Sequence, residues 1–142
     1  MDWKLELVTV PVADVDRAKA FYGEQMGFHV DVDFSAGDDF RVVQLTPPGS
    51  ASSIALMRNS DAPGTLQGIH LVVDDIEAAH AELVGRGVEA SEPFHFDAGQ
   101  QVPGIHTERG DYESFFSVAD PDGNGWLVQE VGHARAGGQA GA

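Results

Sequence analysis

Two stretches of this chain carry the same order of apolar and acidic residues, 61 positions apart. The first is the run VADVDRAKAFY, which starts at Val12, and the second is VDDIEAAHAEL, which starts at Val73. In each run an apolar, strand-like segment ends at an acidic residue, and apolar residues then recur at helical spacing. This shared order indicates an internal duplication, so we expect a ligand pocket between the two copies.

The first copy is predicted to contain one helix and four strands. Asp14 is the expected N-cap of a helix over 14–26, and Gly27 can adopt the positive φ that ends a helix. Alternating or continuous apolar runs, separated by turn-forming residues, predict strands over 3–12, 28–34, 40–46 and 52–58. The predicted order is β-α-β-β-β.

The second copy repeats this order. Asp75 caps a helix that carries Ile76 and Leu83 and ends near Gly85, and strands are expected over 66–73, 88–96, 114–119 and 125–131. The segment 97–113 has no counterpart in the first copy, and loops of this length in compact domains are often functional. We expect a single domain over 1–131, with modules over about 3–59 and 66–131, followed by a flexible tail over 132–142.

The chain is strongly acidic. Its 142 residues hold 23 acidic and 8 basic side chains, a formal charge of −15, which argues against nucleic-acid or membrane partners and favours a cationic small molecule. Acidity that only keeps the protein dispersed is the alternative. The lack of cysteine excludes disulfides and thiolate ligands. Without a signal-like or membrane-spanning run, we expect a cytoplasmic protein.

Several of these segments resemble one known family. The run from Val12 to Tyr22, the pair Gly27-Phe28 and the turn DPDGN at 120–124 resemble signatures of the vicinal oxygen chelate (VOC) superfamily, which includes glyoxalase I, bleomycin-resistance proteins and extradiol dioxygenases. The resemblance covers about residues 5–131. It implies an α+β fold, in which two tandem βαβββ modules form an eight-stranded, U-shaped mixed sheet with helices outside and a ligand cleft inside. It also implies a homodimer.

The resemblance further implies four metal-ligand positions. In this sequence they are Leu7, Ala55, Gly68 and Leu127. None of these residues has a side-chain donor, whereas a catalytic metal needs about three protein ligands. We therefore expect no family metal and no other cofactor. A displaced divalent metal site, built from His70, Gln129 and a residue of the 97–113 loop, is the alternative.

His70 is the leading candidate for chemistry. By the two-residue period of a strand it shares a face with Gly68, just as Gln129 shares one with Leu127, so we expect His70 to point into the cleft, where it could bind a ligand or transfer a proton. A structural, half-buried histidine is the alternative. We predict a catalytic pair of His70 and Glu113, and ligand-binding residues Thr9, His70, His106, Tyr112, Phe116 and Gln129.

The loop over 97–113 concentrates reactive side chains. Around Arg109 lie His106, Glu108, Asp111, Tyr112 and Glu113, a density that suits a lid over the cleft. A solvated, charged loop is the alternative. Nearby aromatic residues could line the pocket, and strand parity predicts that about half of them face it: Phe94, Phe96, Phe115, Phe116 and Trp126.

The turn at 120–124 also matches the start of a calcium-binding EF-hand loop. The twelfth position of that loop requires a bidentate glutamate and is Val131 here, so we predict a hairpin turn instead.

Two functions fit the sequence. The first is a glyoxalase/bleomycin-resistance-like protein that binds a small organic molecule in the cleft without the family metal. The alternative is an enzyme, a lyase, isomerase, epimerase or dioxygenase-like protein, that uses His70 and a loop carboxylate such as Glu113, with or without a displaced metal.

Overall fold

The computed structural model describes residues 1–58 and 62–132, so the predicted tail beyond Gly132 lies outside the described residues. The described chain divides into two compact units. The first holds residues 1–67 together with 120–124, and the second holds residues 68–119 and the chain from Gly125. Within the described part, no helix has the length and apolar character needed to cross a membrane.

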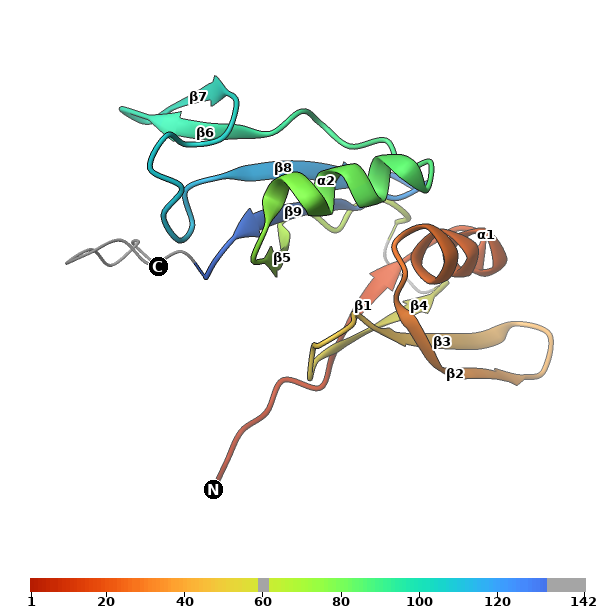
Figure 1. Cartoon of the computed structure of the whole chain (residues 1–142). Coiled ribbons are helices and arrows are strands. Elements are labelled where there is room, and N and C mark those ends of the chain that lie inside the picture. The colour runs from red at the N-terminus through yellow and green to blue at the C-terminus, as the bar shows by residue number, and fades with distance from the viewer. Residues whose placement is uncertain (59–61, 133–142) are drawn as a thin grey trace. The chain divides into compact units, whose positions relative to one another are not determined.

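The first unit is a four-stranded mixed sheet with one helical segment (Figure 1). Its strands are β1 (Leu7–Pro11), β2 (His29–Ala36), β3 (Phe40–Thr46) and β4 (Ser53–Met57). They lie in the order β1-β4-β3-β2, with β1 parallel to β4 and the other pairs antiparallel. Helix α1 (Val15–Ala20) covers one face and buries the apolar side chains of Val10, Val43, Leu45 and Leu56.

The predicted helix over 14–26 changes type along its length. Asp14 has extended backbone and accepts a hydrogen bond from the Arg17 amide at 3.1 Å, so it is the N-cap that the sequence predicts. After α1 the chain continues as a π-helical turn, η1 (Phe21–Gln25), in which the Met26 amide bonds to the Phe21 carbonyl at 2.8 Å.

The second unit is a five-stranded mixed sheet covered by one helix. Its elements are β5 (Ile69–Val73), α2 (Ile76–Gly85), β6 (Phe94–Asp97), β7 (Gln100–Pro103), β8 (Phe115–Ala119) and β9 (Gly125–Glu130). The strand order is β5-β9-β8-β6-β7. Figure 1 shows α2 lying across β8 and β9, and the side chains packed beneath it are Ile76, Leu83, Phe116, Val118, Trp126 and Val128.

The α+β fold, the two βαβββ-type modules and the mixed sheets are confirmed, and the second module has one strand more than predicted. Strand β7 lies inside the segment 97–113, which was predicted as a loop, and it pairs with β6 through a tight turn at Ala98 and Gly99, both with positive φ. The described strands form one sheet of four strands and one of five.

The turn at 120–124 packs within the first unit, although it joins two strands of the second. The Asp120 carboxylate accepts hydrogen bonds from the Tyr22 hydroxyl at 2.8 Å and from the amides of Asp122 and Asn124, both at 2.9 Å. Asn124 donates from its side chain to the Pro11 carbonyl at 2.9 Å. These bonds confirm the hairpin turn in place of an EF-hand loop, because protein donors hold the carboxylate.

Candidate functional site

The second sheet has one face that its helix does not cover, and we call it the open face. Strand pairing sets His70 opposite Leu127, and Gln129 opposite Val72 on one side and Phe115 on the other. The residues of β9 that alternate with Leu127 and Gln129 are buried on the α2 side. His70 and Gln129 therefore share the open face, as the strand period predicted, and His70 is exposed there. What they bind stays a prediction.

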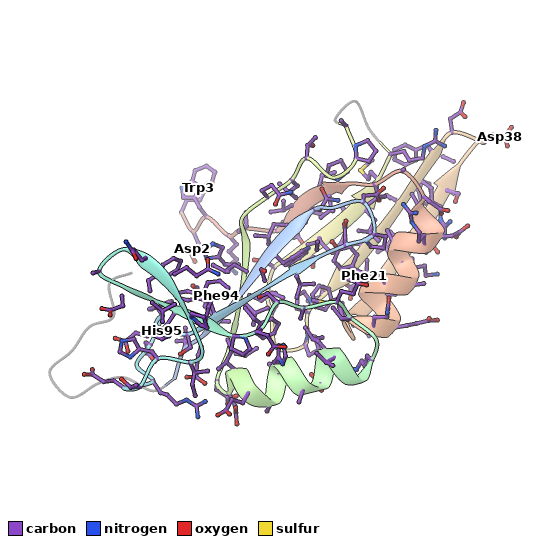
Figure 2. The ribbon with its side chains drawn as sticks, turned by 90° about the horizontal axis from the view of Figure 1, so that it is seen from above. Asp2, Trp3, Phe21, Asp38, Phe94 and His95 are labelled. Atoms are coloured by element: carbon purple, nitrogen blue, oxygen red, sulfur yellow. The ribbon has the colours of Figure 1, made fainter. Side chains whose placement is uncertain are left out.

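Three phenylalanines pack together on this face, and we call them the phenylalanine cluster. Phe94 lies directly opposite Phe115, and their rings stack with centroids 5.8 Å apart. The Phe96 ring meets both edge-on, at 5.8 Å from Phe94 and 5.6 Å from Phe115. Phe96 is 49% exposed, while Phe94 and Phe115 are 7% and 9% exposed. Phe94 is labelled in Figure 2 beside His95, which points to the other side of β6.

A hollow of about 150 Å³ adjoins the phenylalanine cluster, and we call it the aromatic hollow. Its lining residues are Phe96, His106, Tyr112, Glu113 and Phe115. The loop thus brings together three residues that the sequence predicted as site residues, namely His106, Tyr112 and Glu113. The Glu113 Oε2 atom lies 3.2 Å from His106 Nδ1 and accepts the Gly110 N–H at 2.9 Å.

The His106 ring has two polar contacts at Nδ1. The Glu108 nitrogen lies 3.1 Å from this atom, and Glu113 Oε2 lies 3.2 Å from it. The His95 ring meets the His106 ring edge-on, with centroids 5.4 Å apart.

Arg109 anchors the loop that carries these residues. Its Nη2 lies 2.6 Å from Glu130 Oε2, its Nε lies 3.3 Å from Glu130 Oε1, and its Nη1 lies 3.0 Å from Glu77. Hydrogen bonding to Glu130 is the main cause that raises the pKa of Arg109, with the charges of Glu130, Glu77 and Asp75 adding to it. Glu130 is fully buried and also accepts the Ile76 N–H at the start of α2, at 2.9 Å.

The backbone of this loop is held in an uncommon conformation. Arg109 and Tyr112 have φ angles of 48° and 61°, in the left-handed region that non-glycine residues seldom adopt. The Tyr112 N–H donates to the Glu130 carbonyl at 2.8 Å, and the Gly132 N–H donates to Asp111 at 2.6 Å. Such conformations persist only where the surroundings fix them, and they concentrate at functional sites.

Sequence reasoning missed the pair of Arg109 and Glu130. The available signal was an acidic side chain at a buried position of a strand, because a buried carboxylate requires a charged or hydrogen-bonding partner.

The structure places one predicted ligand-binding residue away from the open face. Phe116 is fully buried on the α2 side, where its ring meets the His80 ring edge-on at 5.1 Å. Its neighbour Phe115 occupies the open face instead, because Phe115 pairs with Gln129 of β9, whose side chain lies on that face. Thr9 belongs to the first unit, where it lies on the edge strand β1 and is paired with Ala55 of β4. The imidazole beside Glu113 is that of His106 rather than the predicted His70.

The residues at the family's metal positions do not fit a catalytic metal. Ala55 is paired with Thr9 and Gln44, and Leu127 is paired with His70 and Ser117, so of these strand neighbours only His70 is a common transition-metal ligand. Across residues 1–58 and 62–132, no group of three or more histidine, aspartate or glutamate side chains is arranged to hold a metal ion.

Comparison with known proteins identifies relatives over nearly the whole chain. The "Uncharacterized protein YetH" of Bacillus subtilis (strain 168) is 25% identical over 127 residues, which are 87% of this chain and 94% of that protein. A glyoxalase/bleomycin resistance protein from Streptomyces sp. CB03234 is 30% identical, with a TM-score of 0.69, and the match covers 89% of this chain and all of that one.

A third relative has a described binding function. TnmS3, an antibiotic binding protein from Streptomyces sp. CB03234, is 30% identical with a TM-score of 0.69, over 91% of this chain and 96% of that one. The family model "Glyoxalase/Bleomycin resistance protein/Dioxygenase superfamily" matches residues 4–128. The duplicated modules, their sheet topology and these matches agree, and the chain belongs to the Glyoxalase/Bleomycin resistance protein/Dioxygenase (VOC) superfamily.

Proposed function

We propose that this protein binds a flat aromatic molecule on the open face of the second sheet and does so without the family metal. The observation that carries this proposal is the phenylalanine cluster beside the aromatic hollow. Small-molecule sites are mostly apolar and aromatic, with a few polar groups that orient the ligand. The half-exposed ring of Phe96 offers an apolar surface, and Tyr112, Glu113 and Gln129 offer polar groups near it.

Two further observations support a binding function. TnmS3, which is 30% identical over most of both chains, is described as an antibiotic binding protein. Binding also needs no Lewis acid, which agrees with apolar side chains at the metal positions Leu7, Ala55 and Leu127 and with Gly68.

The proposal is tested with 9-anthracenemethanol, a flat, neutral and fluorescent molecule, by fluorescence anisotropy. We expect saturable binding that weakens about tenfold in Phe96→Ala, because stacking and apolar burial at one ring contribute about 1 to 2 kcal/mol. Phe34→Ala is the matched control, since Phe34 is 51% exposed and also meets another ring edge-on, that of Phe40 at 6.2 Å. Equal losses in the two variants, or no saturable binding by the unmodified protein, contradict the proposal.

A second candidate function is acid–base catalysis, favoured by the distance of 3.2 Å between Glu113 and His106. In this function Glu113 would transfer the proton, and its partner would be either His106 or His70. The test is exchange of the α-protons of phenylacetone with deuterated solvent, followed by NMR. Exchange with a bell-shaped pH profile that is lost in Glu113→Gln and in one histidine variant supports this function. Exchange at the rate of the buffer alone removes it.

A further inference from the structure

We infer that Gln129 is the specificity-determining residue of the open face, so that the preferred ligand is a neutral, flat aromatic molecule with a carboxamide or lactam group at its edge. This inference rests on the proposed binding function and adds the chemical class of the ligand to it. The evidence is the position of Gln129 in the sheet, the apolar side chains around it and the hydrogen-bonding capacity of its amide.

Gln129 belongs to a row of side chains that crosses the open face. Strand pairing places Gln129 of β9 between Val72 of β5 and Phe115 of β8, and Phe115 lies opposite Phe94 of β6. Of these four residues only Gln129 is polar. Neighbouring strands are about 4.8 Å apart, so a ring system stacked on the phenylalanine cluster, whose Phe94 is labelled in Figure 2, has Gln129 at its edge.

The Gln129 amide lies among apolar side chains. Besides Val72 and Phe115, its neighbour on the same face of β9 is Leu127. Gln129 is half-buried, and no residue in the described part of the chain forms a hydrogen bond with its side chain. A ligand that covers this amide without replacing its bonds to water leaves a polar group unsatisfied, and sites of this kind discriminate strongly between ligands that can and cannot form those bonds.

Other polar groups near the phenylalanine cluster are already engaged. Glu113 Oε2 lies 3.2 Å from His106 Nδ1 and accepts the Gly110 N–H at 2.9 Å. These contacts hold the loop together within the protein, whereas the Gln129 amide is available to a ligand.

The chemistry of an amide indicates the class of ligand. A glutamine side chain carries a carbonyl acceptor and an NH₂ donor. A carboxamide or lactam carries the complementary donor and acceptor, so the two groups can form a pair of hydrogen bonds. A ketone can only accept, and it leaves the Gln129 carbonyl unpaired. A carboxylate also lacks the donor, and it would be repelled by a chain with a formal charge of −15.

The experiment compares 2-anthracenecarboxamide with 2-acetylanthracene by fluorescence anisotropy. The two probes share one ring system and one carbonyl group, and the NH₂ group of the first is a methyl group in the second. We expect the unmodified protein to bind the carboxamide about tenfold more tightly, because the ketone leaves the Gln129 carbonyl unpaired. Gln129→Met, which replaces the amide by an apolar group of similar length, should reduce this preference to within about twofold and leave the affinity for the ketone within about threefold.

The matched control is Gln101→Met. Gln101 lies on the same face, opposite Phe96 of the phenylalanine cluster, but it belongs to the edge strand β7 and is exposed. Because water keeps access to its amide, this variant should retain the tenfold preference. A preference that survives in Gln129→Met, or that is lost equally in Gln101→Met, would overturn the inference. Equal binding of both probes by the unmodified protein would overturn it and leave the proposed function intact. Failure of both probes to bind would overturn the two together.

Discussion

The start of the helix is built differently in the two copies. Asp14 and Asp75 are equivalent in the repeat, and each caps its helix by accepting an amide hydrogen bond from three residues later, at 3.1 Å and 3.0 Å. In the second unit Arg109 lies against this helix start. In the first unit the equivalent place is a charged hollow of about 340 Å³, lined by Ala13, Asp14, Val15, Asp16, Asp38, Asp39, Arg41 and Arg58. Asp38, at the tip of the β2–β3 hairpin, is labelled in Figure 2.

The two copies differ in the carboxylates that Arg41 and Arg109 contact. Arg41 bonds to Asp16, and Arg109 bonds to Glu77, which occupies the same position of the second copy. The second partner of Arg41 is Asp33 on the partly exposed hairpin, whereas the second partner of Arg109 is the fully buried Glu130. A buried charge must stay paired, so the second unit fixes its loop while the first unit retains an open, solvated ion pair.

The largest effect is expected from removing Arg109. Arg109→Met leaves the buried Glu130 without its cation, and we expect the free energy of unfolding to fall by about 3 kcal/mol, measured by urea denaturation at pH 7. Arg41→Met is the matched change in the first unit and should cost less than about 1 kcal/mol, because its carboxylate partners remain hydrated. Similar losses for the two variants would show that burial of Glu130 does not distinguish the copies.

A second experiment separates stability from positioning. In the double variant Arg109→Met/Glu130→Gln no buried charge remains and the glutamine carbonyl can still accept the Ile76 N–H, so most of the lost stability should return. The loop loses its ionic anchor, however, and must be ordered when a ligand binds. We expect the binding of 9-anthracenemethanol to weaken by about 1 kcal/mol, measured by fluorescence anisotropy. Unchanged affinity would show that the pair only stabilises the fold. Arg41→Met should leave the affinity unchanged.

The features that the sequence could predict are local. Helix caps depend on one side chain and an amide three residues away, and Asp14 and Asp75 both follow the prediction. The clustering of His106, Tyr112 and Glu113 also follows from their closeness along the chain.

The features that the sequence did not predict depend on pairing between distant segments, or on which face of the sheet a side chain occupies. Arg109 and Glu130 are 21 residues apart and meet only when the loop packs against β9. Strand β7 is polar and mostly exposed, so it lacks the alternation that marks a half-buried strand. Phe115 and Phe116 are adjacent and equally apolar, so the sequence does not indicate which of them lies on the α2 side of the sheet. Pairing with β9 determines the face of each side chain.

The smallest expected effect concerns pH and the exposed ion pair of the first unit. Hydrogen bonds from Arg41, and then from Lys19, hold the pKa of Asp33 well below its ordinary value of 3.8. The folded-state pKa is thus lower than the unfolded one, so this pair stabilises the fold above about pH 3.8 and the contribution is lost as the pH falls toward the folded-state value. The difference in urea midpoint between the unmodified protein and Asp33→Asn should therefore be constant from pH 5 to pH 7 and shrink below about pH 3.8. A difference that persists unchanged in strong acid would show that Asp33 acts through packing rather than charge.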